Sequence, residues 1–206
     1  VTRIEVKGQF PRTGSNQFIG REVAHAAAER DLVPDDGAPL LMGIDVARFG
    51  DDESVFRFRR GRDARSLPPM RYRGVDTMTL ATEAATAIER LKPDAVFVDG
   101  GGVGGGVVDR LKMLGYRVIE VQSGEAAHDP DKYLNRRAEM WGEMRDWLVY
   151  GCIDNDDSLI DDFLRLLEGQ RTLPPGFGWF GAYDELSAIG RNFPLIVDVN
   201  LPNIAE

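Results

Sequence analysis

The sequence predicts an α/β fold in which a five-stranded mixed sheet carries helices on both faces. Three apolar runs, at 40–46, 54–60 and 70–75, follow one another without a helical stretch between them, which predicts an antiparallel meander of three strands. Two further apolar runs, at 95–98 and 116–121, alternate with segments of helical spacing. Such crossover connections join parallel strands, so the last two strands should add in parallel to the meander.

The first part of the chain is predicted to connect rather than to build the sheet. Residues 1–17 are polar and carry Gly and Pro breakers, as a linker does. The Ala-rich stretch Ile19 to Arg30 predicts a short helix, and a loop follows to Pro39. We therefore expect residues 1–38 to be a linker and short helix from an upstream domain, and residues 39–206 to form the main domain.

The three strands of the meander differ in pattern. Leu40 to Val46 is a short apolar run interrupted by Gly43 and Asp45, which is typical of a buried strand. After a Gly/Asp turn, Ser54 to Arg60 alternates between a face with Val55, Arg57 and Arg59 and a face with Phe56 and Phe58. Met70 to Val75 completes the meander.

The helical and parallel part begins with a helix over Leu80 to Leu91, where apolar residues recur at helical spacing. The remaining predicted elements follow in chain order: a strand at 95–98, a helix at 107–114, a strand at 116–121, a long helix at 133–150 and a last helix at 159–167. Residues 172–206 are Gly- and Pro-rich and give no assignment. This order is the layout of the ribonuclease-H-like fold.

Composition limits the classes of protein. The chain has 206 residues and a net charge of −9, which argues against non-specific DNA binding through overall charge. Its single cysteine excludes an internal disulfide and a cysteine metal cluster. We see no signal peptide and no run of the roughly 18 apolar residues that a membrane span needs, and expect a location in the cytoplasm.

Two aspartates carry the functional argument. Asp45 lies inside an apolar strand, where a carboxylate is costly unless it is paired, hydrogen-bonded or bound to metal, although it could simply cap the following turn. Asp99 ends the strand 95–98, and the first and fourth strands of such a sheet commonly lie side by side. Two neighbouring carboxylates repel each other, and Mg²⁺ or Mn²⁺ removes that repulsion. A pair of such ions can activate water and stabilise the leaving oxygen in phosphodiester hydrolysis.

Two neighbouring features have open interpretations. The glycine run 100–106 could cradle a phosphate before a helix, or it could serve tight strand-to-helix packing. It is not a P-loop, since no Gly-Lys-Ser/Thr follows. Asp51 is either a turn former or a further metal ligand reaching the site from beyond the first strand.

A basic stretch suggests where DNA binds. Residues 57–73 hold seven arginines against one acid. We expect a hairpin with an outward basic face that contacts phosphate, because arginine pairs well with phosphate. The alternative is a solvated edge that charge protects from aggregation. The predicted DNA-binding residues are Arg57, Arg59, Arg60 and Arg62.

Four segments resemble the nuclease domain of tailed-phage large terminases. They are Gly-Gln-Phe-Pro-Arg (8–12), Gly-Ile-Asp-Val-Ala-Arg-Phe-Gly-Asp-Asp (43–52), Val-Asp-Gly-Gly-Gly-Val-Gly-Gly-Gly-Val-Val-Asp-Arg-Leu (98–111) and Tyr-Leu-Asn-Arg-Arg-Ala-Glu-Met-Trp (133–141). Each motif alone is modest, but the four in this order are fairly specific.

The resemblance implies a ribonuclease-H-like endonuclease that cuts concatemeric viral double-stranded DNA during packaging with Mg²⁺ or Mn²⁺. Asp45 and Asp99 match the family's first-strand and fourth-strand aspartates. The implied partners are a portal protein, a small terminase subunit and an upstream ATPase domain of a longer chain, in the cytoplasm of the infected bacterial host. No Walker motif is present, so we expect no ATP hydrolysis.

The family's third acid is the one departure. It usually lies in a Ser-Pro-Asp-type segment leading into a C-terminal helix, and no such segment is visible here. Either the chain is truncated, or another acid substitutes, or the site is incomplete. Asp184 is the substitute candidate for a catalytic role.

Two rival functions remain. A nucleotide-binding domain of the actin and sugar-kinase superfamily shares the fold and uses similar Gly-Ile-Asp and Asp-Gly-Gly elements, but it needs a second lobe. A non-catalytic module that docks on portal or DNA would keep the fold without cutting, and the missing third acid favours it.

Overall fold

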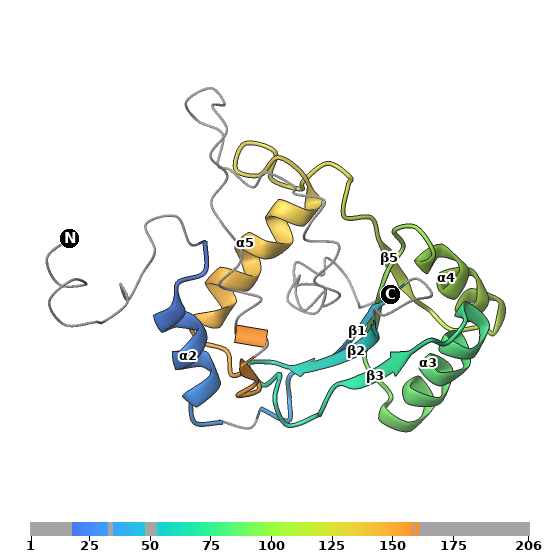
Figure 1. Ribbon diagram of the computed structural model, residues 1–206, viewed down its shortest axis with the longest axis horizontal. Coiled ribbons are helices and arrows are strands. Elements are labelled where there is room, and N and C mark those ends of the chain that lie inside the picture. Colours follow the sequence, from blue (N-terminus) through green and yellow to red (C-terminus); the bar gives the residue numbers. More distant parts are fainter. Residues whose placement is uncertain (1–17, 33–34, 48–52, 158, 161–206) are drawn as a thin grey trace, which may run out of the picture.

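A five-stranded mixed sheet in the order β3-β2-β1-β4-β5 organises the computed structural model (Figure 1). The structure describes residues 18–32, 35–47, 53–157 and 159–160. β1 pairs antiparallel with β2 and parallel with β4, while β3 and β5 form the edges. The strands are β1 (Leu40–Asp45), β2 (Glu53–Arg60), β3 (Met70–Arg73), β4 (Ala95–Asp99) and β5 (Ile119–Val121). This confirms the predicted fold.

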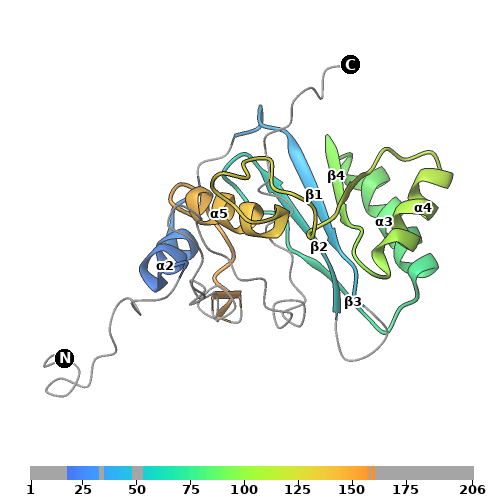
Figure 2. The same ribbon diagram turned by 90° about the horizontal axis from the view of Figure 1, so that it is seen from above.

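Helices cover both faces of the sheet, as Figure 2 shows, with α3 and α4 on one side and α5 and α2 on the other. The helices among the described residues are α2 (Arg21–Glu29), α3 (Thr77–Leu91), α4 (Gly104–Met113) and α5 (Arg136–Leu148). None of those in the described ranges is long and apolar enough to cross a membrane.

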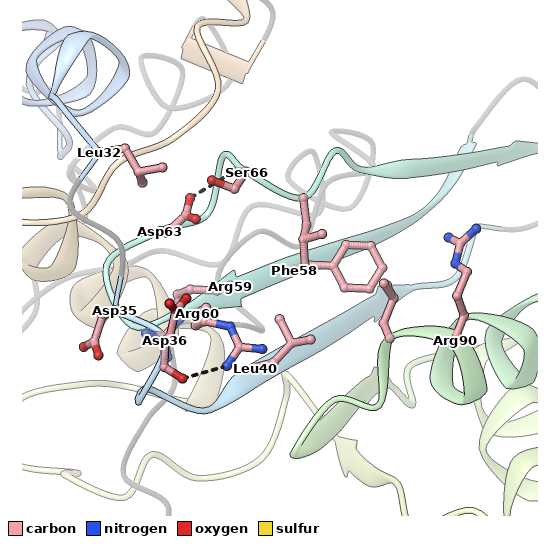
Figure 3. A pocket seen from close by; sticks show the side chains of 12 residues that line it. Leu32, Asp35, Asp36, Leu40, Phe58, Arg59, Arg60, Asp63, Ser66 and Arg90 are labelled. Atoms are coloured by element: carbon pink, nitrogen blue, oxygen red, sulfur yellow. Dashed lines mark hydrogen bonds between the residues drawn. The ribbon is translucent and has the colours of Figure 1, made fainter.

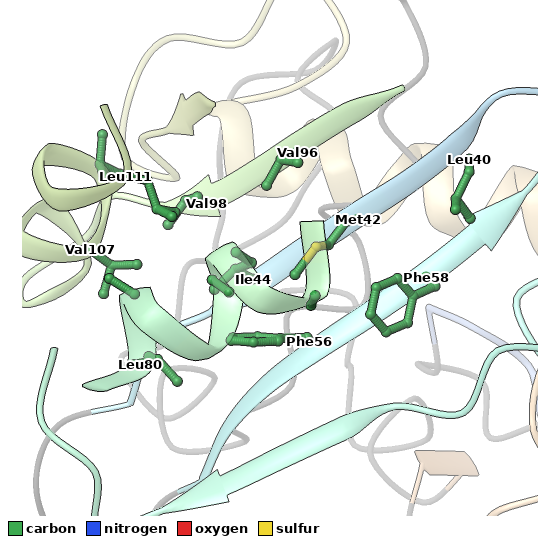
Figure 4. Close-up of a cluster of buried hydrophobic side chains, with 14 residues drawn as sticks. Leu40, Met42, Ile44, Phe56, Phe58, Leu80, Val96, Val98, Val107 and Leu111 are labelled. Atoms are coloured by element: carbon green, nitrogen blue, oxygen red, sulfur yellow. The ribbon is translucent and has the colours of Figure 1, made fainter. Parts of the chain in front are cut away.

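The larger core lies between the sheet and the helices α3 and α4 (Figure 4). Every second residue of the central strands points into it, because successive strand side chains alternate between faces. Phe56 and Phe58 of β2 are at most 1% exposed and pack with Leu80 of α3 and Leu111 of α4. The alternating residues point to the opposite face, where apolar Leu41 and Phe97 lie as well as charged residues.

A second core joins α2 to α5 beside that opposite face. Ala24, Ala27 and Ala28 of α2 pack with Trp141 and Met144 of α5. The domain boundary at residue 38 stays a prediction, but the helix α2 shares a core with the helix that covers the sheet.

Several helices and strands begin at other residues than predicted, because of local hydrogen bonds. α3 begins at Thr77 rather than Leu80, because the Asp76 carboxylate accepts hydrogen bonds from the Met78 and Thr79 amides at 2.9 and 2.8 Å. α5 begins at Arg136 because Asn135 caps it. β5 begins only at Ile119, since the Tyr116 amide still donates to the Leu111 carbonyl at the end of α4.

Candidate metal centre

Asp45 and Asp99 are the last residues of two adjacent parallel strands. The pairing of β1 with β4 runs to Ile44 opposite Val98, and each aspartate is the next residue on its strand. Neighbouring strands lie about 4.8 Å apart, so the two backbones place these carboxylates side by side at the carboxyl ends of β1 and β4. The predicted juxtaposition of the first and fourth strands is thus present.

The two carboxylates also share a face. Ile44 and Val98 point into the core under α3 and α4, so the next residue on each strand points to the other side. Leu41 and Phe97 lie on that other side and contact Met140 of α5. The aspartates therefore stand on the α5 face, at the carboxyl ends of β1 and β4.

The two aspartates differ in surroundings. Asp45 is only 9% exposed, as expected for a carboxylate inside a central strand. Asp99 is half-buried, and its Oδ1 accepts a hydrogen bond from the Gly101 amide at 2.9 Å. The backbone after β4 thereby orients the Asp99 carboxylate. This orientation limits where a ligand of that carboxylate could bind.

The glycine run after β4 is explained in part by steric crowding. A Cβ on Gly104 would lie 1.8 Å from the Asp99 carbonyl oxygen, so only glycine fits where α4 begins against the strand end. Gly102 has φ of +61°, in the left-handed region that favours glycine. These contacts support the tight-packing interpretation, and the phosphate-cradle interpretation stays a prediction.

A divalent cation suits this pair by donor chemistry. Two carboxylates on adjacent strands offer the oxygen ligands that Mg²⁺ and Mn²⁺ prefer, and binding would offset their mutual repulsion. Within the described ranges no group of three His, Cys, Asp or Glu side chains could hold a metal ion. The other predicted acids, Asp51 and Asp184, lie outside the described residues. Asp45 and Asp99 are thus the candidate ligands that the described residues offer, and metal binding stays a prediction.

The arginine-rich stretch does not form a uniformly outward face. Arg57 and Arg59 are each 5% exposed, on the α5 face of β2. Arg60 is half-buried and donates to the Ala38 carbonyl at 2.9 Å, while Arg62 is exposed and lies over the Tyr150 ring. The structure therefore differs from the expected outward basic face at its first two arginines, and contact with DNA stays a prediction for all four.

Burial lowers the pKa of both Arg57 and Arg59. Burial lowers the pKa of Arg57, and the ion pair with Asp154 opposes that shift. Burial lowers the pKa of Arg59 to about 10, and its Nη1 donates to the Gly61 carbonyl at 2.6 Å. Arg57 thus ties the centre of β2 to the segment that follows α5.

Glu139 is a structural carboxylate that the sequence reasoning missed. It is 3% exposed, and its two oxygens accept hydrogen bonds from the His128 and Asp129 amides, each at 2.9 Å. Arg136 adds an ion pair at 2.6 Å. Burial acts to raise the pKa of Glu139, but these bonds outweigh it and lower that pKa. Its position in the segment 133–141 was the available signal.

A cavity of about 380 Å³ lies at the other end of the sheet (Figure 3). Leu40 at the start of β1 and Phe58 of β2 line it, with Arg60 and Arg90 among its polar residues. Leu40 and Asp45 are five residue steps apart, or about 17 Å along the strand. The cavity is therefore separate from the aspartate pair.

Solved structures with the same fold are phage nuclease domains. The nuclease domain of the large terminase subunit gp2 of bacterial virus Sf6 matches with a TM-score of 0.66 and 16% identity, over 87% of this chain and 94% of that one. A variant of that domain with manganese and beta-thujaplicinol gives 0.64 and 18% over the same shares. The large terminase nuclease of thermophilic phage G20c with bound magnesium gives 0.62 and 12%, over 89% and 97%.

These likenesses establish the fold. No protein-family model and no curated protein matches the sequence. The chain therefore shares the ribonuclease-H-like fold of large-terminase nuclease domains at 12 to 18% identity.

Proposed function

We propose that this chain is a divalent-metal-dependent endonuclease that cuts double-stranded DNA. The observation that carries the proposal is the pair of carboxylates, Asp45 and Asp99, at the ends of adjacent parallel strands and on one face. The fold is that of phage terminase nuclease domains, one of which was solved with bound magnesium. Mg²⁺ or Mn²⁺ is the proposed cofactor.

The roles of the two aspartates follow from their positions. Asp45, held in the centre of the sheet, and Asp99, held by the Gly101 amide, would ligate the cation from fixed directions. Bound ions in such sites activate a water molecule and stabilise the leaving oxygen of the phosphodiester. A two-metal site needs a further acid, for which Asp51 and Asp184 are the sequence candidates.

The proposed biological setting is viral genome packaging. We infer concatemeric DNA as the substrate, with a portal protein, a small terminase subunit and an upstream ATPase domain as partners, in the cytoplasm of an infected bacterium. The motif resemblance and the shared fold support this setting. Arg60 and Arg62 are the predicted DNA contacts that remain partly or fully accessible.

A plasmid-nicking assay with Mn²⁺ tests the nuclease proposal. We expect the chain to nick supercoiled plasmid, and Asp45→Asn and Asp99→Asn each to reduce the rate about 100-fold, since each removes a metal ligand. Asp109→Asn is the matched control, because it removes an exposed acid of α4. Nicking that survives both site substitutions would overturn the assignment.

A docking module without nuclease activity is the second candidate. Its support is that no Ser-Pro-Asp-type segment with the family's third acid is visible in the sequence. It predicts that the chain binds duplex DNA or portal protein but does not nick plasmid, with Mn²⁺ or Mg²⁺, even when Asp45 and Asp99 are intact.

A further inference from the structure

The strand register places one arginine in line with the aspartate pair. Arg71 of β3 lies opposite Val55 of β2, and Val55 lies opposite Asp45 of β1. Asp99 follows on β4, opposite Val121 of β5. Directly opposite residues present their side chains on the same face, so these five form a single row across the α5 face of the sheet. Arg71 is two strands, or about 10 Å, from Asp45.

The four arginines that the sequence predicted as DNA contacts lie elsewhere on the sheet or are buried. Arg60 pairs with Leu40 at the far end of β1, about 17 Å along the strand from Asp45, and Arg62 follows beyond it. Arg57 and Arg59 are 5% exposed, whereas the Arg71 side chain is 28% exposed. Arg71 is the only one of these five arginines that lies in the same row as Asp45 and is also accessible to solvent.

The present contacts of Arg71 are loose. Its guanidinium lies 3.6 Å from a Glu53 oxygen and 3.4 Å from an Asp156 oxygen. Charge-assisted hydrogen bonds are usually shorter, about 2.7 to 2.9 Å. Glu53 is shared with Arg73 at 3.2 Å, so it keeps a partner if Arg71 moves. Partly exposed pairs of this kind contribute little and can be exchanged for a phosphate.

We propose that Arg71 binds a backbone phosphate of the DNA strand held at the Asp45–Asp99 site. The inference rests on the proposed nuclease function and names the residue that seats the substrate beside it. Glu53 and Asp156 hold the guanidinium on the α5 face in the absence of DNA, and a phosphate oxygen takes their place when DNA binds. The flat fork of arginine suits two phosphate oxygens, which a lysine cannot match.

Fluorescence anisotropy with a short labelled duplex, without divalent cation, tests this by binding alone. We expect Arg71→Gln to weaken binding about tenfold, as the loss of one charged contact to phosphate should. The slope of log affinity against log salt should fall by about one. Arg71→Lys should recover part of the affinity. Arg90→Gln, which removes an exposed arginine of α3 on the opposite face, should match the parent chain.

The outcomes separate the two proposals. If the parent chain binds duplex but Arg71→Gln behaves like Arg90→Gln, the role of Arg71 is wrong and the nuclease proposal stands. If Arg62→Gln weakens binding and Arg71→Gln does not, DNA contacts the far end of the sheet. If the parent chain neither binds duplex nor nicks plasmid, the nuclease proposal itself fails. Thermal melting and Mn²⁺ affinity of Arg71→Gln should stay at parent values, which a purely structural role would not allow.

Discussion

Asp45 and Asp99 occupy equivalent positions on two parallel strands, one residue beyond the pair Ile44 and Val98. A parallel register fixes which side chains share a face, so the two carboxylates are brought together by the backbone and not by a loop. The arrangement therefore depends on whatever holds the ends of β1 and β4.

Gly104→Ala should disturb the end of β4. The new Cβ would meet the Asp99 carbonyl oxygen at 1.8 Å, and backbone cannot yield as a flexible side chain can. We expect a loss of about 3 kcal/mol in unfolding free energy, measured by urea denaturation. Gly105→Ala is the control, since its Cβ would have no neighbour closer than the Gly100 carbonyl at 3.9 Å. A Gly104→Ala variant as stable as Gly105→Ala would contradict the packing account.

Breaking the buried ion pair of Arg57 with Asp154 should be strongly destabilising. Arg57 is 5% and Asp154 21% exposed, so removing one partner leaves a charge with poor access to water. We expect Arg57→Met to lose about 3 kcal/mol and the double substitution with Asp154→Leu to recover part of it. A double-mutant cycle by urea denaturation measures the coupling, and additive losses would show that the pair is not coupled.

Glu139→Gln should weaken the anchor of the loop at His128 and Asp129. The pKa of Glu139 is lowered in the folded chain, so its stabilisation is present above the unfolded pKa of roughly 4.3 and is lost as pH falls through the lower folded pKa. We expect a loss of about 2 kcal/mol at pH 7. The difference from the parent chain should shrink on acidification. A constant difference across pH would rule out the ionised carboxylate as its cause.

Glu143→Gln should have the opposite sign. Burial raises the pKa of Glu143, and its Oε2 is buried without a hydrogen-bond partner among the described residues. A raised folded pKa means that stability declines as pH rises from the unfolded pKa through the folded one. We expect Glu143→Gln to be about 1 kcal/mol more stable than the parent chain at pH 7 and equal to it below pH 4. Melting curves at the two pH values decide this.

Much of the fold could be predicted because hydrophobic periodicity reports it directly. The apolar runs predicted the strands β1 and β4, and helical spacing predicted the order of the helices. A carboxylate inside an apolar strand made Asp45 a candidate metal ligand. The alternation along β2 also separated its two faces correctly. It could not say which face meets water, because α5 and the segment after it cover Arg57 and Arg59 through contacts distant in the sequence.

Contacts between side chains and distant backbone were harder to foresee. Glu139 acts through backbone amides ten and eleven residues earlier, and such contacts leave no periodic signal. The alignment of Arg71 with Asp45 depends on the strand register, which the apolar runs alone did not reveal. The third acid stays a prediction, since Asp51 and Asp184 lie outside the described residues.

Direct measurement of Mn²⁺ binding tests the central claim, that Asp45 and Asp99 jointly ligate a divalent cation. Electron paramagnetic resonance of free Mn²⁺ during titration gives the dissociation constant without relying on cleavage. We expect the parent chain and Asp109→Asn to bind Mn²⁺, and Asp45→Asn and Asp99→Asn each to bind it roughly tenfold or more weakly. Unchanged Mn²⁺ affinity in both site variants would contradict it.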